Sequence, residues 1–198
     1  TSASWTVSEE DFLKDSAVIS NLRFRASYGL QGNIDKNTSP YVVGENKTTT
    51  ILPGQTEPII EVTTPPNSKL RWEKTENTNL GFDLGMFNNR ISIVTDFYGR
   101  KRTDLIGMKA LPLENGFEFT NMNWAQVSNK GYEIALATKN IDRPNFKWNT
   151  TINFAHNKSN IDRLEIKDNS YLPNQEGHAV NAVFGFKTNG IDENGYPL

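Results

Sequence analysis

The chain has 198 residues, of which 36% are hydrophobic and 11% aromatic, and its formal net charge is −2. This charge, with lysines and arginines scattered along the chain, argues against a nucleic-acid binder, and the absence of cysteine excludes disulfide frameworks, thiolate chemistry and cysteine-based zinc sites. No stretch approaches the roughly 18 consecutive apolar residues of a transmembrane helix, although a barrel strand needs only about 9–11 alternating residues.

Apolar and polar residues alternate in six segments, which predicts strands over residues 2–8, 21–31, 75–87, 90–104, 124–138 and 146–157. A period of two, without a helical pattern of comparable length, predicts an all-β fold. Gly131 is expected to mark a bulge in the fifth segment. Five of the nine prolines lie within residues 33–71, and because proline lacks the amide that a ladder needs, this region is predicted to lie outside the sheet.

The third and fourth segments predict a hairpin with a tight turn at Asn88-Asn89. One face of this hairpin is apolar and is expected to meet lipid: it carries Leu80, Phe82, Leu84, Met86, Ile91, Ile93 and Phe97. The other face, with the second segment, places charges at mid-strand and is expected to face a lumen: it carries Arg23, Arg25, Asp83 and Asp96. Such charges would be costly in a sandwich core unless paired, whereas a water-filled or plugged lumen solvates them.

Short and long connections alternate along the chain. The short ones are residues 9–20, 88–89 and 139–145, and the long ones are residues 32–74, 105–123 and 158–198. In an antiparallel up-and-down meander, alternate connections lie at opposite ends of the sheet, and outer-membrane barrels show this polarity, with short periplasmic turns and long extracellular loops. Trp72 and Trp124 at one end, and Phe87, Phe146 and Trp148 at the other, fit two aromatic belts. A soluble β-sandwich that binds glycans stays the alternative, because a sheet with one wet face has the same polarity.

Two long stretches resemble the barrel of SusC/RagA-type TonB-dependent transporters. They are LRWEKTENTNLGFDLGMFNNRISIVTDFYGRKRTDLI (70–106) and VSNKGYEIALATKNIDRPNFKWNTTINFAHNKSNI (127–161), and residues 3–33 and 183–191 (VFGFKTNGI) are similar to the same family. The resemblance implies a large plugged barrel in the outer membrane of a Bacteroidota-type Gram-negative bacterium. It also implies TonB as the energy source, a SusD-like surface lipoprotein as partner, and a glycan or peptide as substrate. Six strands are far fewer than the about 22 of such a barrel, so residues 1–198 are expected to be one segment of the wall, with the plug domain elsewhere.

No set of residues predicts catalysis. Asp83 and Asp96 could in principle form an acid–base pair, but nothing around them resembles a substrate-orienting constellation. Each histidine lacks a second ligand nearby, and residues 192–195 lack the ligand spacing of a calcium loop. The sequence therefore predicts no enzyme, no metal site and no cofactor. Four aromatic residues of the long loops are the candidates for contact with substrate or lipoprotein: Tyr41, Tyr171, Phe184 and Phe186.

Overall fold

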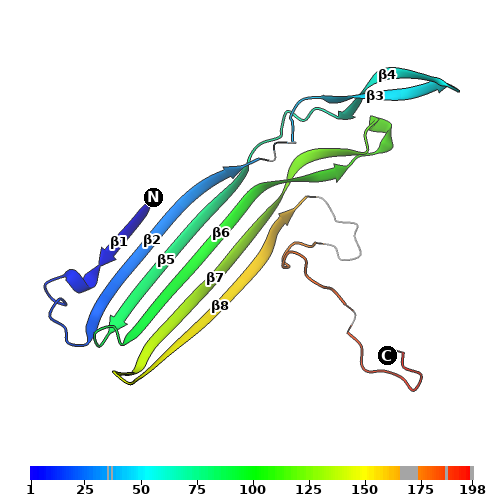
Figure 1. The fold of residues 1–198 in the computed structure, drawn as a ribbon. Coiled ribbons are helices and arrows are strands. Elements are labelled where there is room, and N and C mark those ends of the chain that lie inside the picture. The colour runs from blue at the N-terminus through cyan, green and yellow to red at the C-terminus, as the bar shows by residue number, and fades with distance from the viewer. Residues whose placement is uncertain (35, 37, 166–173, 186, 197–198) are drawn as a thin grey trace.

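The computed structural model describes residues 1–34, 36, 38–165, 174–185 and 187–196 (Figure 1). The elements in chain order are β1 (Ser2–Thr6), η1 (Val7–Glu9), β2 (Ile19–Asn33), β3 (Val43–Leu52), β4 (Gln55–Thr64), β5 (Glu73–Met86), β6 (Ile91–Ala110), η2 (Leu113–Asn115), β7 (Phe119–Arg143) and β8 (Phe146–Leu164). Six strands form one sheet in the order β1-β2-β5-β6-β7-β8, in which every neighbouring pair is antiparallel. The predicted all-β antiparallel meander is therefore confirmed.

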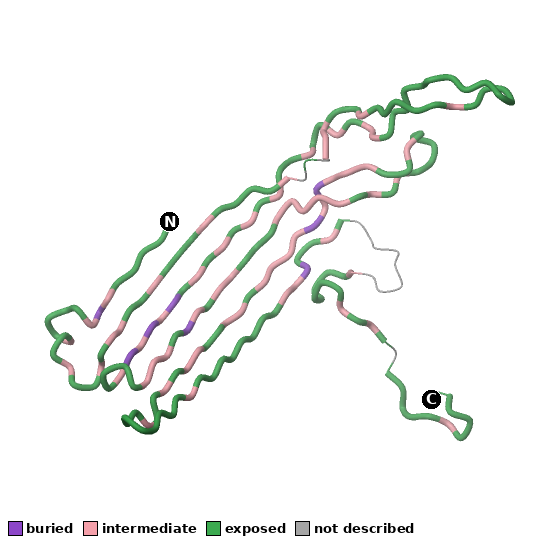
Figure 2. The backbone as a smooth tube through the Cα atoms, viewed as in Figure 1, coloured by how far each residue is buried: buried purple, intermediate pink, exposed green. Residues whose placement is uncertain are grey.

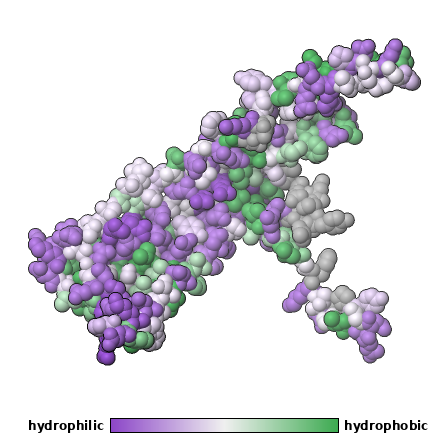
Figure 3. Space-filling view, in the orientation of Figure 1, coloured by the Kyte–Doolittle hydropathy of each residue, from purple (hydrophilic) through white to green (hydrophobic). Residues whose placement is uncertain are grey.

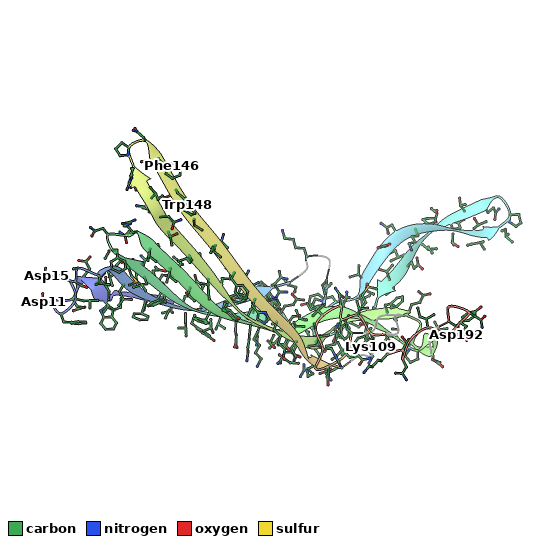
Figure 4. All side chains as sticks on the ribbon, turned by 90° about the horizontal axis from the view of Figure 1, so that it is seen from below. Asp11, Asp15, Lys109, Phe146, Trp148 and Asp192 are labelled. Carbon is green, nitrogen blue, oxygen red and sulfur yellow. The ribbon has the colours of Figure 1, made fainter. Side chains whose placement is uncertain are left out.

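The sheet is a single curved layer without an enclosed core (Figures 2 and 4). Among the described residues, only Val7, Ala125 and Ile161 are buried hydrophobic residues. The β-sandwich alternative requires a second sheet over the apolar face, and the only other sheet in the described residues is the two-stranded β3–β4 hairpin, which extends beyond one end of the first (Figure 1). Leu84 and Ile93 are accordingly half-buried rather than enclosed.

The connections differ at the two ends of the sheet. At one end lie residues 7–18, the turn of residues 87–90, and the turn of residues 144–145. Figure 4 shows Asp11, Asp15, Phe146 and Trp148 toward this end, and Lys109 and Asp192 toward the other. The opposite end carries the β3–β4 hairpin, the tip of β6–β7 and the tail after β8 (Figure 1). We call these the short-turn end and the long-loop end.

Several strands run beyond their predicted limits. β6 continues to Ala110 and β7 begins at Phe119, so most of the expected loop at residues 105–123 is paired strand. The ladder shifts register between Arg102 and Leu105, where Asp104 has a φ of 58°. Such a bulge shifts the alternation of apolar and polar residues by one position, so the period-two pattern that predicts the strand stops before the strand ends. β8 likewise continues to Leu164, into the loop expected from residue 158, whereas β1 ends at Thr6 and η1 follows.

The proline-rich connection contains a hairpin where the sequence predicted no sheet. β3 and β4 pair from Val43–Thr64 to Leu52–Gln55, and Gly54 adopts a φ of 82° in the turn. Pro58 lies inside β4, opposite Thr48. Each strand of a two-stranded sheet has one side without a ladder partner, so a residue without an amide hydrogen is tolerated there. The prediction was wrong because it treated proline as excluding every kind of strand.

The turn between β5 and β6 spans Phe87–Arg90 rather than the two asparagines alone. Phe87, Asn88 and Asn89 have φ values of 53°, 54° and 58°. Asparagine tolerates this left-handed region, whereas phenylalanine seldom adopts it. The amide of Phe87 donates to the Val18 carbonyl at 2.8 Å and that of Asn89 to Ser20 Oγ at 3.2 Å, so the residue before β2 and Ser20 of β2 support the strained turn.

Candidate functional site on the polar face

The cross-strand register separates the side chains of the sheet into two faces. Arg23 lies opposite Asp83, and Arg25 lies opposite Gly81, which in turn lies opposite Asp96. Directly opposed residues project to the same face. The four charged residues predicted to share a face are thus brought together, over β2, β5 and β6. We call this surface the polar face.

The four charges form one ion-pair network. Arg23 donates from Nε and Nη2 to Asp83 Oδ2 at 2.8 and 2.6 Å. Arg25 donates from Nη2 to Asp83 Oδ1 at 2.9 Å and from Nη1 to Asp96 Oδ1 at 3.2 Å. The side chain of Asp83 is only 9% exposed. Because each carboxylate accepts hydrogen bonds from a guanidinium group, the pair is arranged as charge-compensated acceptors and not as an acid and a base.

Gly81 provides the space in which Arg25 crosses from one carboxylate to the other. A Cβ atom on Gly81 would lie 2.5 Å from Cζ of Arg25, so the guanidinium group lies against the bare backbone. Gly131 has the same relation to Tyr98, whose hydroxyl oxygen would lie 2.5 Å from an added Cβ. The register through Gly131 is continuous on both sides, so the bulge expected there is absent; the β7 ladders shift near Gln126 and near Lys139 instead.

Beyond the network, toward the long-loop end, the polar face holds a hollow of about 800 Å³. Its lining is rich in amides and charges, and includes Asn77, Asn79, Asp96, Arg100, Arg102, Asn129, Glu133 and Asn157. Oδ1 of Asn79 is buried and has no hydrogen-bond partner among the described residues. A buried acceptor of this kind costs free energy until a donor reaches it. The hollow can therefore receive a hydrogen-bonding group from outside the chain.

The opposite face of the sheet is apolar and uncovered. The register places Leu80 opposite Phe97, Leu84 opposite Ile93 and Met86 opposite Ile91, so the seven residues predicted for this face share it. Neighbouring rings lie 5.3 to 6.2 Å apart in the pairs Phe24–Phe82, Phe97–Tyr132 and Tyr132–Phe154. Leu80 is nevertheless 55% exposed and Phe97 53%. A continuous exposed surface of this kind indicates an interface with lipid or protein.

The aromatic candidates of the loops are dispersed. Tyr41 precedes β3 and is 76% exposed. Phe184 lies in the tail, where its ring packs edge-on against His178 at 5.0 Å. Tyr171 and Phe186 lie outside the described residues. The structure therefore brings no two of the four predicted contact residues together within its described part.

A second polar network, at the long-loop end, was not predicted. Asn123 is buried: its Oδ1 accepts from the Arg71 amide at 2.9 Å, and its Nδ2 donates to the carbonyls of Arg71 and Asp104 at 2.7 and 2.6 Å. Arg71 also pairs with Asp104 at 2.5 Å, and this guanidinium hydrogen bond holds the pKa of Asp104 below its usual value. The only signal in the sequence is the break in alternation at Asp104.

The described residues contain no group of three or more histidine, aspartate or glutamate side chains placed to hold a metal ion. Within the same residues, no helix has the length and hydropathy needed to cross a bilayer.

Comparison with known proteins identifies similar barrels. The family model described as TonB dependent receptor-like, beta-barrel, matches residues 2–195. TonB-dependent receptor P3 of Formosa agariphila is 30% identical over 215 residues, which cover 96% of this chain and 20% of that protein. TonB-dependent receptor SusC of Bacteroides thetaiotaomicron is 30% identical over 216 residues, which cover 98% of this chain and 21% of that protein. The chain thus spans about a fifth of the length of these relatives.

Among solved structures, two states of the RagAB peptide importer are similar. The open-open state gives a TM-score of 0.69 at 27% identity, over 82% of this chain and 18% of the other. The closed-closed state gives a TM-score of 0.76 at 23% identity, over 100% of this chain and 24% of the other, and shows likeness of fold.

Proposed function

Because the chain belongs to the TonB-dependent receptor family of outer-membrane β-barrels, we propose that it forms a section of the wall of a nutrient importer that takes up glycans or peptides. The family is one of transporters, so the sheet acts by enclosing a path and not by catalysis. The likeness to RagAB, a peptide importer, supports peptides as the substrate class, and the likeness to SusC supports uptake by a TonB-dependent receptor.

The observation that carries the proposal is the two-faced single layer. In the proposed arrangement the apolar face, including Leu84 and Ile93, meets the acyl chains of the membrane, and the polar face lines the lumen. Burying such an aliphatic side chain in hydrocarbon gains about 1.5–3 kcal/mol relative to exposure in water. The backbone of each strand is paired along the ladder, as a bilayer requires, and the remaining edges join further strands of the barrel.

The polar face contacts the plug domain and the passing substrate in this proposal. The ion-pair network around Arg25 compensates its own charges, so it gives a rigid section of wall. The hollow beside it differs, because Asn79 offers an unsatisfied acceptor and Arg100 and Arg102 offer donors. A hydrogen-bonding segment of the plug, or a polar substrate, would satisfy these groups.

The long-loop end forms the outer chamber and the contact with a SusD-like lipoprotein. Asn67 Nδ2 donates to the Asn121 carbonyl at 2.7 Å, which ties the base of the β3–β4 hairpin to β7. A hollow of about 430 Å³ lies between β4 and the tip of β6–β7. Exposed apolar residues along the hairpin, such as Ile60 and Val62, offer contact surface. Figure 3 shows hydrophobic residues gathered where the hairpin approaches the sheet.

Cysteine labelling of the full-length protein in native membranes tests the arrangement. Ile152 lies on the apolar face and its neighbour Asn153 on the polar face of β8, and this chain has no cysteine of its own. With a water-soluble maleimide, we expect Asn153→Cys to react and Ile152→Cys to be protected until the membrane is dissolved in denaturant. Equal labelling of the two positions in intact membranes would disprove the proposed orientation.

Uptake measurements test the function of the whole protein. Deleting TonB, or the segment that contacts it, is expected to abolish uptake by the full-length protein while leaving the barrel in the membrane. Uptake that persists would exclude TonB-dependent import.

Removing residues 43–64 tests the contact with the lipoprotein. This deletion is expected to weaken co-purification of the lipoprotein more than it changes barrel stability, because the hairpin pairs only with itself.

A further inference from the structure

A hollow of about 460 Å³ opens on the apolar face, at the side nearer the long-loop end. Its apolar wall is formed by Leu80, Phe97 and Tyr132, and its polar rim by Lys130 and Lys158. Gly99 forms part of the floor: a Cβ atom there would have no neighbour within 4 Å, so the space exists because this position carries no side chain.

The register orders these residues into two adjacent rows. One row runs Leu80, Phe97, Tyr132, His156 across β5 to β8, with the rings of Tyr132 and His156 5.5 Å apart. The next row toward the long-loop end runs Thr78, Gly99, Lys130, Lys158. Two residues along a strand correspond to about 7 Å. A boundary from aromatic to cationic side chains is therefore crossed within one step of the sheet.

Two like charges, those of Lys130 and Lys158, lie side by side on this face. Lys130 and Lys158 are directly opposite on β7 and β8, both are exposed, and neither forms an ion pair with any residue that the structure describes. Like charges in this position destabilise a sheet. The pairing is thus unfavourable for the sheet alone and favours an anion between the two ammonium groups.

Acidic residues of this face lie beyond the lysine row, toward the long-loop end. Glu76 lies opposite Lys101, and Asp162 accepts from Ser128 Oγ at 2.9 Å and from Asn160 Nδ2 at 2.8 Å. Lys101 thus has the acidic Glu76 directly across from it, whereas the cross-strand neighbours of Lys130 and Lys158 are each other and Gly99.

We propose that this hollow binds the phosphate-bearing headgroup of an anionic lipid in the outer leaflet. The phosphate lies between Lys130 and Lys158, and the adjoining acyl chain lies against Leu80, Phe97 and Tyr132. This inference rests on the proposed function, since it needs the apolar face to meet lipid. A free phosphate ion would use the two lysines but would leave the apolar wall without a partner, so the hollow favours a lipid.

The test is a native mass-spectrometry titration of the full-length transporter in detergent. Phosphatidylglycerol is the anionic probe and phosphatidylcholine the zwitterionic control. Each lysine near an anionic lipid surface contributes about a factor of five in binding, so Lys130→Gln with Lys158→Gln should weaken retention of phosphatidylglycerol by about 30-fold. Retention of phosphatidylcholine should be unchanged.

Arg100→Gln is the matched control, because Arg100 follows Gly99 on β6 and projects to the polar face. It should retain phosphatidylglycerol like the wild type. Equal retention by the wild type and the double lysine variant would overturn the inference, and so would equal losses in the double variant and in Arg100→Gln. Inorganic phosphate forms the second arm: competition at concentrations similar to those of the lipid would show a site for a free anion and remove the lipid assignment.

The labelling of Ile152→Cys separates this inference from the proposed function. If that position is protected in membranes while the double lysine variant retains the lipid normally, only the headgroup site is wrong. If the position is labelled freely, the orientation of the wall is wrong, and the lipid site is excluded with it.

Discussion

Replacing Gly81 by alanine should destabilise the barrel, although the same change usually stabilises a strand. The new Cβ would lie 2.5 Å from Cζ of Arg25 and 2.6 Å from its Nη2. Arginine is flexible and can swing away, so the cost is the set of hydrogen bonds that it gives up. Arg25 would lose its bonds to Asp83 and Asp96, while Arg23 keeps Asp83 paired.

The magnitude follows from two opposing contributions. Charge-assisted hydrogen bonds contribute about 1.5–3 kcal/mol when desolvated, and less when water screens them. The Arg25 side chain is 33% exposed, so we take about 2–3 kcal/mol for its bonds together. Replacing glycine by alanine restricts the unfolded chain and returns about 0.4–1 kcal/mol. The net expectation is a destabilisation of about 1–2.6 kcal/mol.

Gly99→Ala is the control, because an added Cβ there meets open space. It should stabilise the barrel by about 0.4–1 kcal/mol. The assay is urea unfolding of the purified full-length barrel, followed by the gel-mobility difference between folded and unfolded protein. In an Arg25→Ala background, Gly81→Ala should cease to destabilise, since the bonds are already absent. Equal shifts for the two glycines, or an undiminished cost of Gly81→Ala without Arg25, would refute the reasoning.

Three further predictions concern the long-loop end and the strained turn. Asn123→Ala removes three hydrogen bonds at a buried position and should lower the free energy of unfolding by about 2–3 kcal/mol. The control, Asn140→Ala at an exposed position, should change it little. A shift for Asn123→Ala as small as that of the control would contradict the network. The pKa of Asp104 is lowered by Arg71, so this pair stabilises the protein above the unfolded value of about 3.9 and the contribution is lost as pH falls through the lower folded pKa. Asp104→Asn should therefore lower the urea midpoint near neutral pH and lose its effect in acid, and a deficit independent of pH would exclude the linkage. Gly85→Ala should destabilise the β5–β6 turn, because an added Cβ would overlap the Asn89 side chain; slower refolding or a lower urea midpoint, relative to Gly99→Ala, is the measurement, and identical behaviour of the two variants would contradict it.

The faces of the strands could be predicted from the sequence, but the partners across them could not. Alternation from Leu80 to Met86 identifies which residues share a surface, and the tight β5–β6 turn gives the register of that hairpin. β2 and β5 are separated by the β3–β4 hairpin, so nothing local indicates that Arg25 meets Gly81. The network around Arg25 therefore emerges only from the register of distant strands.

The sequence did not predict where some strands end, because single residues interrupt the pattern. Asp104 adopts a left-handed conformation at a bulge, and the phase of β6 changes beyond it. Asn123 supports this irregular point with bonds to two carbonyls, which is a tertiary feature without a sequence pattern. At Pro58 the prediction failed for a different reason: proline was taken to exclude any strand, but it is tolerated in a two-stranded hairpin, where one side of each strand has no ladder partner.

The two faces of the sheet differ in whether residues of the chain itself pair their charges or cover their apolar surface. On the polar face, Arg23 and Arg25 compensate Asp83 and Asp96 internally, and Gly81 and Gly131 let the covering side chains lie close to the backbone. On the apolar face, neighbouring rings stay 5 to 6 Å apart and large side chains such as Leu80 are still half exposed. Water would therefore cost little on the first face and much on the second. A soluble sheet covers such an apolar face with a second layer, and the described residues provide none over this one. In the proposed function, hydrocarbon covers the apolar side, and the single-layer wall of a membrane barrel is the architecture that provides this cover.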